Sequence, residues 1–118
     1  MKALSVKPHW AAMIEAELKT IEIRSRRTNY RGPLLICASA KEVKGWRGLP
    51  RGVALCIVEL QGCRLMRQED EARSGVAVDP KMWSWLLGPV RLVERAPVKG
   101  QLSFFEVPDH LLNRRRAA

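Results

Sequence analysis

Two short apolar runs limit what this chain can fold into. Residues 34–38 and 53–60 hold a single charged side chain between them, and apolar runs of this length are typical of strands that are buried on both faces in the middle of a sheet. The second run can extend past Gly62 through a bulge or bend. Because the chain has only 118 residues, we expect one domain around these two strands.

The N-terminal part adds a strand, a helix and a second strand. Residues 2–6 are predicted to form an edge strand, and Pro8 suits the first turn of a short helix over about 8–17. The apolar residues of that helix have the spacing of one buried face: Trp10, Met13 and Ile14. Residues 19–24 then alternate, which predicts a half-buried strand with Ile21 and Ile23 inside and a polar face formed by Thr20, Glu22 and Arg24.

A second helix is predicted in the C-terminal half. Asp79 and Pro80 provide its cap and first residue, and Gly88 with Pro89 ends it. Its buried stripe leaves Trp85 on the opposite, accessible side, and consists of Met82, Trp83, Leu86 and Leu87.

The connecting segments complete the predicted fold. Residues 41–51 predict a helical turn followed by a loop, and residues 67–78 a mobile polar connection on the surface. Short strands near 90–94 and 102–106 precede a final turn capped by Asp109. These elements predict an α+β fold on a small, mostly antiparallel sheet or barrel of about five to six strands with two or three short flanking helices. A parallel βαβ sheet is disfavoured because the segments are short and the sequence has no glycine-rich phosphate loop.

Basic residues are concentrated in one half of the chain. Twenty-one Lys and Arg against twelve Asp and Glu give a net charge of +9, and residues 1–51 carry eleven of the basic and four of the acidic side chains. This pattern is typical of a protein that binds a polyanion, although a solubilising surface has the same composition. One domain is expected over 1–108, followed over 109–118 by a helical turn and a basic tail, which adds affinity only if it touches phosphate: Arg114, Arg115 and Arg116.

The sequence lacks the patterns of a metal site, a disulfide framework and a secretion signal. Cys37, Cys56 and Cys63 form no closely spaced pair, and His9 and His110 lie about a hundred residues apart. No metal and no other cofactor is therefore expected. No apolar run reaches the roughly 20 residues of a membrane span, and a charge interrupts the short apolar stretch at the N-terminus. A cytoplasmic location, away from membranes, is expected.

Four blocks of the sequence resemble the ASCH domain family. They are residues 2–11, Lys-Thr-Ile-Glu-Ile-Arg at 19–24, Thr-Asn-Tyr-Arg-Gly at 28–32 with Ile-Cys-Ala-Ser at 36–39, and Leu-Leu-Gly-Pro-Val-Arg at 86–91 with Pro-Val-Lys-Gly-Gln at 97–101. The resemblance spans roughly residues 2–107. The family commonly has glycine two positions before the lysine, where this chain has Glu17, so the turn that places Lys19 is expected to differ.

This resemblance implies a PUA-like fold, a small β-barrel with helices at its ends and a cleft lined by the Lys-x-x-Glu-x-Arg strand. It implies binding of RNA or single-stranded nucleic acid; some members are similar to an amidohydrolase that removes the acetyl group from acetylcytidine, and others are ribonucleases. The amidohydrolase-like lysine carries over to Lys19, whereas their threonine three residues later is Glu22 here. Their catalytic acid falls in a variable connection, with four candidates: Glu69, Asp70, Glu71 and Asp79.

Lys19, Glu22 and Arg24 are the candidate residues of the cleft. A partly desolvated lysine loses proton affinity and can act as base or nucleophile, with Glu22 polarising water or substrate. As binding groups, the carboxylate can accept from the exocyclic amine of a base, and the guanidinium can hold phosphate. Glu22 and Arg24 can equally form a simple ion pair on one strand face. Ser39, at the end of the next strand, is a further candidate.

Two basic segments that contain aromatic residues are candidates for nucleic-acid binding. The first consists of Arg26, Arg27, Tyr30 and Arg31, and the second of Lys44, Trp46, Arg47 and Arg51. Long cations suit phosphate, and aromatic faces suit unstacked bases. A solvated loop has the same composition, and Trp46 fits a core position equally well. Trp85 is a candidate stacking platform, whereas Trp10 and Trp83 are expected in the core.

Three functions follow from these residues. The first is an RNA-binding or single-stranded nucleic-acid-binding domain that holds a nucleotide, or a nucleoside-like small ligand, in the cleft. The second is an enzyme, either a hydrolase of the acetylcytidine amidohydrolase type or a ribonuclease, that uses Lys19 and Glu22. The third is a protein-interaction domain whose charge is incidental.

Overall fold

A computed structural model describes residues 1–115 of the chain. Its strands are β1 (Lys2–Val6), β2 (Ile21–Arg24), β3 (Gly32–Ala38), β4 (Val53–Leu65), β5 (Trp83–Leu87), β6 (Arg91–Leu92) and β7 (Phe104–Glu106). Its helices are α1 (Pro8–Glu15), α2 (Glu71–Ser74) and two 3₁₀ turns, η1 (Gln68–Asp70) and η2 (Asp109–Leu111). Within the described residues these strands form one sheet in the order β2-β5-β4-β3-β1-β7, with β6 paired to β4.

The α+β fold and the mostly antiparallel sheet are confirmed. β1 and β3 pair in parallel, and the other pairs of named strands are antiparallel. The sheet has seven strands over the part of the chain described, more than the five or six expected, because the 83–87 segment is a strand as well.

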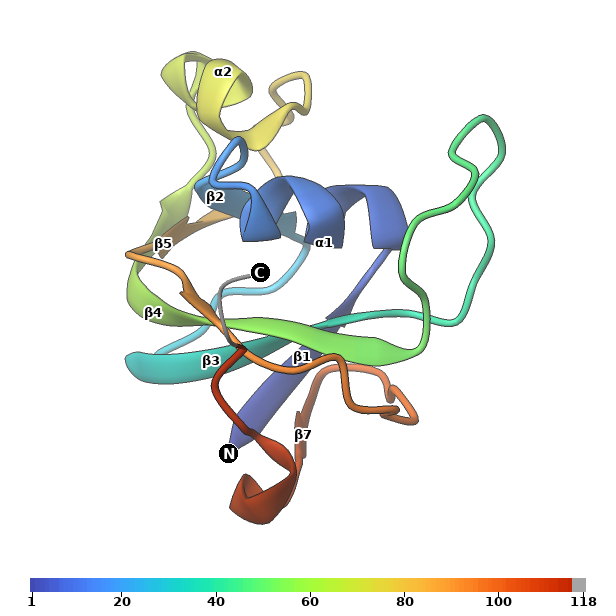
Figure 1. The fold of residues 1–118 in the computed structure, drawn as a ribbon. Helices are drawn as coiled ribbons and strands as arrows, with labels where there is room; N and C mark the ends of the chain where they lie inside the picture. The colour runs from blue at the N-terminus through green and yellow to red at the C-terminus, as the bar shows by residue number, and fades with distance from the viewer. Residues whose placement is uncertain (116–118) are drawn as a thin grey trace.

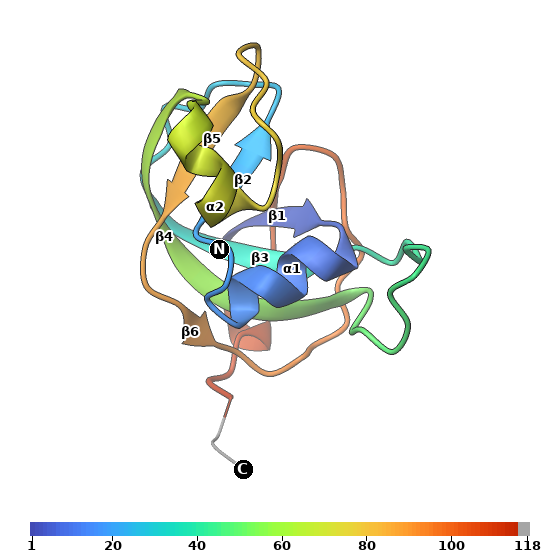
Figure 2. The same ribbon diagram turned by 90° about the horizontal axis from the view of Figure 1, so that it is seen from above.

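The long strand β4 bends the sheet around its core. Its first part pairs with β3 and its last part with β5, and the register shifts between Leu60 and Gly62, as the sequence predicts. A Cβ on Gly62 would lie 3.1 Å from Leu86, so a glycine lets β4 and β5 approach closely at the bend. Figures 1 and 2 show the curved sheet, with α1 lying across β3 and β4.

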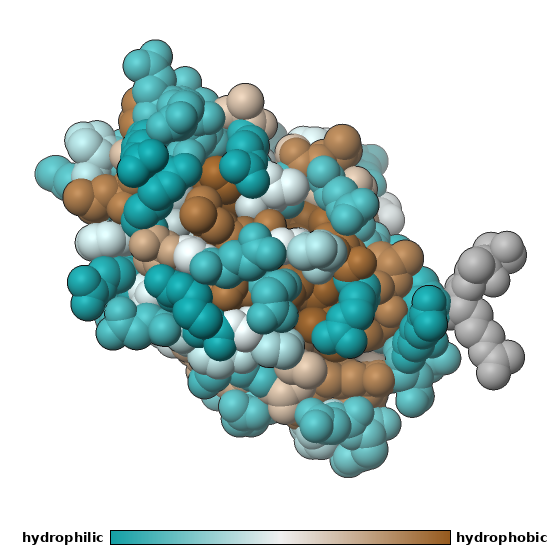
Figure 3. All heavy atoms as spheres, turned by 90° about the vertical axis from the view of Figure 1, so that its left-hand side faces the viewer, coloured by the Kyte–Doolittle hydropathy of each residue, from teal (hydrophilic) through white to brown (hydrophobic). Residues whose placement is uncertain are grey.

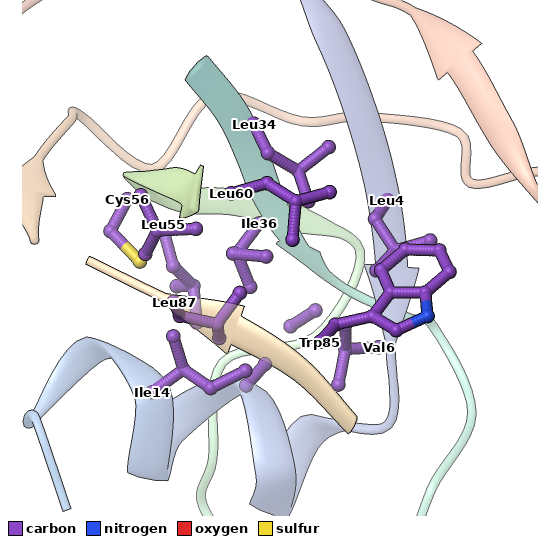
Figure 4. Close-up of a cluster of buried hydrophobic side chains, with 13 residues drawn as sticks. Leu4, Val6, Ile14, Leu34, Ile36, Leu55, Cys56, Leu60, Trp85 and Leu87 are labelled. Carbon is purple, nitrogen blue, oxygen red and sulfur yellow. The ribbon is translucent and has the colours of Figure 1, made fainter. Parts of the chain in front are cut away.

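The two apolar runs form the centre of the core. Alternate residues of β3 point to opposite faces of the sheet: Leu34 and Ile36 pack in one buried cluster with Ile14 of α1 (Figure 4), and Leu35 packs in a second cluster with Phe105 of β7. Both faces of β3 are therefore covered, which confirms the prediction of a central strand.

The prediction that β1 is an edge strand is wrong. β1 lies between β3 and β7, with Leu4 opposite Phe104 and Ala3 opposite Phe105. The partner strand comes from about a hundred residues further along the chain, and a local pattern carries no information about such a partner.

The helix predicted between Asp79 and Gly88 is also wrong. The Met82 N–H donates to the Asp79 carbonyl at 3.0 Å in a single turn, and the chain then extends as β5 between β2 and β4. A segment of five residues between turn signals fits either a helix or a strand. It is a strand here because β2 and β4 supply hydrogen bonds on both sides. Trp85, predicted to be accessible, is 5% exposed, and Trp83, predicted in the core, is half-buried.

Two connections differ from their predictions. Residues 41–51 lack the expected helical turn; Val43 pairs with Trp46 across a tight turn, in a loop that extends away from the sheet (Figure 1). Residues 67–78, predicted as a polar surface connection, fold into η1 and α2 and carry two buried polar residues, Asp70 and Ser74.

The C-terminal segment returns to the sheet. Asp109 begins the predicted final turn, η2. Arg115 donates to the carbonyl oxygens of Val93 and Leu55 at 2.9 and 2.8 Å and to Glu15 at 2.6 Å, so this guanidinium is engaged by the protein itself. Of the three arginines predicted in the tail, Arg116 lies outside the described residues.

The surface mixes apolar and polar side chains. Figure 3 shows one side of the molecule, where apolar patches are interrupted by hydrophilic residues. Leu102 is the most exposed large apolar side chain among the described residues, at 96%, against 69% for Leu18 and 52% for Leu65. None of the helices in residues 1–115 has the length and apolar character that a membrane crossing needs.

Candidate functional site

A cleft of about 270 Å³ opens between β1, α1, β2 and the segment that follows α2. The three candidate residues of the alternating segment all line it, and they are joined there by residues of β1 and α1 and of the turn between them: Lys19, Glu22, Arg24, Ser5, Lys7 and Trp10. The structure therefore brings the predicted lysine, glutamate and arginine into one site.

The position of Lys19 follows from how α1 ends. Glu17 adopts a left-handed backbone with φ 60°; its N–H donates to the Ile14 carbonyl at 3.0 Å, and the Leu18 N–H reaches the Met13 carbonyl at 2.9 Å. This pair of bonds is a Schellman motif, in which glycine is the usual left-handed residue. The turn forms here with glutamate in that position, and Lys19 follows two residues later.

Lys19 is 1% exposed. Its Nζ donates to the Ser74 carbonyl oxygen at 2.5 Å, lies 3.6 Å from Glu22 Oε1, and stands 4.6 Å from the centre of the Trp10 ring. Burial lowers the pKa of Lys19 below its ordinary value, and the negative charge of Glu22 opposes that change. The lysine expected to be partly desolvated is thus fully enclosed.

Glu22 connects Lys19 to Arg24. The Arg24 Nε donates to Glu22 Oε2 at 3.0 Å, and Arg24 Nη2 donates to the Ser5 carbonyl oxygen at 3.0 Å. The Glu22 side chain is 7% exposed and that of Arg24 is 30% exposed. The simple ion pair considered from sequence therefore forms, and Arg24 still presents part of its guanidinium to the cleft.

A buried carboxylate fixes the start of α2. Asp70, one of the four candidate acids, is 1% exposed and accepts from Arg64 at 2.6 and 2.8 Å, from the Ser84 hydroxyl at 2.7 Å and from the Arg67 N–H at 2.9 Å. These donors, Arg64 foremost, hold the pKa of Asp70 well below its usual range. None of the four candidate acids lines the cleft among the residues described, so Asp70 acts on the site only by positioning α2.

The end of α2 closes the cleft over Lys19. The Thr20 N–H donates to the Arg73 carbonyl at 2.9 Å, and Arg73 Nε donates to Thr20 Oγ1 at 3.0 Å. Gly75 follows with φ 75°, and a Cβ there would lie 3.0 Å from the Trp10 ring. Glycine therefore satisfies both the left-handed backbone and the close approach to Trp10.

Sequence reasoning missed several parts of this site. Trp10 carries helical spacing and was expected in the core; it is half-buried and forms a wall beside Lys19. Ser5 and Ser74 contribute backbone carbonyls, which no side-chain pattern can reveal. Asp70 lies in a run of charged residues that is typical of an exposed loop.

The first basic segment is divided by the structure. Arg26 and Arg27 are exposed and line a second cavity of about 430 Å³, which Arg24 also lines. Tyr30 and Arg31 instead donate to backbone carbonyls nearby. They brace the loop and are not brought to the cleft.

The second basic segment lies outside the cleft. Three cations of the 41–51 loop are exposed, namely Lys44, Arg47 and Arg51. None of them lines a cavity that Arg24 also lines. Trp46 is 49% exposed, which excludes a core position. Its ring lies 5.5 Å from that of His9, which lies 4.3 Å from that of Trp10, so aromatic rings extend from the cleft wall toward this loop.

Ser39 lies next to the cleft rather than in it. It lines a third cavity of about 530 Å³ together with Lys7 and Arg24, both of which also line the cleft. The Ser39 Oγ is buried and has no hydrogen-bond partner among the described residues.

Residues 1–115 contain no group of three or more His, Cys, Asp or Glu side chains placed to hold a metal ion. Burial raises the pKa of both the Cys37 and the Cys56 thiol to about 12. A thiol of such high pKa is a poor nucleophile at neutral pH.

Comparison with known proteins gives one family and a set of similar structures. The family described as the ASCH domain matches residues 4–94, and no curated protein matches the chain. The crystal structure of ASCH from Zymomonas mobilis is 16% identical, with a TM-score of 0.60, and the match covers 93% of this chain and 89% of that one. Its tyrosine-to-phenylalanine variant gives 12% identity, a TM-score of 0.67 and coverage of 93% and 91%. At such low identities the likeness shows the fold.

Proposed function

This chain belongs to the ASCH domain family, and we propose that it binds single-stranded RNA and holds one nucleotide in the cleft of Lys19, Glu22 and Arg24. The observation that carries the proposal is the row of charged groups from the enclosed Lys19 to the partly open Arg24. Burying charges costs several kcal/mol per ion, and apolar residues of similar volume are often as stable or more so. Fixed charges at the wall of a cleft are therefore better suited to recognising a polar ligand than to stability.

The chemistry of the cleft matches a nucleotide. A carboxylate such as Glu22 can accept from the exocyclic amine of a base, and the remaining N–H groups of Arg24 can donate to a phosphate. Trp10 adds half-buried aromatic surface to the cleft wall, beside the Lys19 ammonium, and aromatic surface is what an unstacked base contacts. Lys7 is exposed at the cleft wall and adds a second cation, in keeping with the family's association with nucleic acid and the net charge of +9.

The test is fluorescence anisotropy of a labelled single-stranded RNA of twelve random nucleotides, titrated at several salt concentrations. We expect binding that weakens steeply as salt rises, because phosphate contacts release counterions. Glu22→Gln, which keeps the shape but removes the charge, should weaken binding about tenfold, the equivalent of one hydrogen bond to a charged group. The exposed Glu94 provides the matched control, Glu94→Gln, which should bind as the wild type does. Failure to bind at low salt would refute the proposal and favour a small ligand in the cleft.

The environment of Lys19 favours a second candidate function, hydrolysis of an acetylated cytidine. Burial lowers the pKa of Lys19, and Glu22 lies 3.6 Å from its Nζ. In its neutral form, Lys19 would take a proton from water, whose oxygen attacks the acetyl carbon. The carbon–nitrogen bond then breaks, and the departing amine receives the proton from Lys19. The products are cytidine and acetic acid, which loses its remaining proton to solvent. Release of cytidine from N4-acetylcytidine, followed by chromatography, tests this function. Turnover that survives in full in Lys19→Ala would exclude Lys19 as the base.

A further inference from the structure

The second cavity adjoins the cleft through a shared residue. Arg24 lines both, and Ser25, Arg26 and Arg27, which directly follow it in the chain, line the second cavity. The second cavity is the larger of the two, at about 430 Å³ against 270 Å³. Arg24 therefore borders both the cleft and the second cavity.

The second cavity differs from the cleft in its chemistry. Its apolar lining includes Leu4, Trp85 and Phe104, with the Trp85 and Phe104 rings 5.5 Å apart. Figure 4 shows the Trp85 ring beside Leu4 at the end of the core cluster. Leu102, 96% exposed, also lines this cavity. The cleft thus presents charged groups. The second cavity is lined by the exposed Leu102 and the half-buried Phe104, with Leu4 and Trp85 buried beneath them, next to two exposed arginines, Arg26 and Arg27.

Arg24 holds its guanidinium in a fixed orientation where the cleft and the second cavity meet. Its Nε is bonded to Glu22 and its Nη2 to the Ser5 carbonyl, which fixes the guanidinium plane. Its Nη1 has no hydrogen-bond partner among the described residues, and the side chain is 30% exposed. A pre-oriented guanidinium with free donors is well suited to a phosphate oxygen.

We propose that the ligand is a single strand of at least two nucleotides, with one base in the cleft, the neighbouring base in the second cavity and the phosphate between them on Arg24. This inference rests on the proposed function and adds the length of the ligand to it. Stacking of a base on aromatic side chains is tolerant of sequence, so the cleft selects the first base and the second cavity contributes affinity.

The experiment compares three probes by isothermal titration calorimetry with the full chain. They are the four ribonucleoside 5′-monophosphates, the four corresponding homodinucleotides with a 5′ phosphate, and the same dinucleotides in which the second nucleotide lacks its base. The abasic probe keeps the extra phosphate, so it separates stacking from charge. We expect the best intact dinucleotide to bind about tenfold or more tighter than its abasic counterpart, the gain typical of one stacked base.

The tryptophan indole N–H signals in an NMR spectrum report which site is filled. Trp10 lines the cleft, and Trp85 lines the second cavity, where its Nε1 donates to the Arg26 carbonyl at 2.9 Å. The monophosphate should shift the Trp10 signal, and the intact dinucleotide should shift both signals. The two signals are assigned with single Trp10→Phe and Trp85→Phe variants.

A pair of leucine variants tests the second cavity without touching the core. Leu102→Ser removes an almost fully exposed apolar side chain and should reduce the advantage of the intact dinucleotide about threefold, the loss of part of one stacking contact. Leu65→Ser, also exposed but outside both cavities, is the control and should keep that advantage.

The outcomes separate this inference from the proposed function. If the monophosphate shifts Trp10 while intact and abasic dinucleotides bind equally, the proposed function stands and the second base site is refuted. If no probe binds and neither the Trp10 nor the Trp85 signal shifts, both the proposed function and this inference are refuted. A dinucleotide that shifts only Trp85 would refute the placement of a base in the cleft.

Discussion

Replacing Glu17 by glycine should stabilise the protein. Glu17 holds the left-handed position of the turn that ends α1, with φ 60°, and its side chain is exposed. This conformation costs a residue with a Cβ about 1–2 kcal/mol. Glycine relieves that cost but also gives the unfolded chain more freedom, which offsets about 0.4–1 kcal/mol.

The net effect of Glu17→Gly is therefore a gain of about 0.5–1 kcal/mol in the free energy of unfolding. For a chain of 118 residues, the entropy of unfolding near 60 °C is about 0.25 kcal/mol per degree, so Tm should rise by about 2–4 °C. Chemical denaturation with urea measures the first quantity and calorimetry the second.

Glu17→Ala is the matched control. Alanine removes the same charge and the same side-chain atoms beyond Cβ but keeps the steric cost, so its stability should stay close to that of the wild type. If the glycine and alanine variants were equally stable, the left-handed strain would not be the cause and the description of the turn would be wrong. Because the hydrogen bonds of the turn involve only the backbone, Glu17→Gly should also leave RNA affinity unchanged.

Two further predictions concern the dependence of stability on pH. Asp70→Asn should lower the free energy of unfolding at pH 7 by about 3 kcal/mol, because Arg64 loses its buried partner. The pKa of Asp70 is lowered in the folded state. The wild type should therefore lose this contribution to stability as the pH falls below about 4. Urea unfolding of both proteins should show curves that converge in acid, and parallel curves would contradict the assignment. Burial lowers the pKa of Lys19 in the folded state, whereas in the unfolded chain the lysine keeps its proton up to the ordinary pKa of about 10.4. Between these two pKa values the unfolded state binds more protons than the folded state. The free energy of unfolding of the wild type should therefore increase relative to that of Lys19→Met as the pH rises toward 10. A difference between the two proteins that stays constant with pH would show that Lys19 is as basic in the folded state as in the unfolded chain.

The sequence is most informative where the apolar pattern is continuous. The central strands, the bulge before Gly62 and the approach of Lys19, Glu22 and Arg24 to one site all follow from patterns within a few residues. The 83–87 segment shows where such patterns fail: its five residues carry valid helix signals on both sides, and only the presence of β2 and β4 decides that it is a strand. Because the segment was predicted as a helix, Trp85 was expected on the accessible side, whereas in the strand it is 5% exposed.

For a related reason, the sequence predicts the candidate charged residues of the site but not their burial. Lys19, Glu22 and Arg24 all come from one short segment, residues 19–24, but their environment is formed by segments far away in the chain. Lys19 was expected to be partly desolvated, and its complete burial depends on the carbonyl of Ser74, 55 residues later. Nothing in the sequence around Ser74 indicates that its backbone will accept from a lysine.

The connection from Asp70 to Lys19 explains why the site depends on a residue outside it. Asp70 gathers Arg64, Ser84 and the Arg67 N–H at the start of α2, and the last residue of α2, Ser74, accepts from Lys19. A change at Asp70 can therefore release α2, open the cavity over Lys19 to water and return the pKa of Lys19 toward its ordinary value. The Asp70 carboxylate therefore stabilises the charged cleft without lining it, while the Arg24 side chain is 30% exposed at the open end. Burial of Lys19 depends on the Ser74 carbonyl at the end of α2, whereas the position of Arg24 depends on Glu22 and the Ser5 carbonyl, so different segments control the two ends of the cleft.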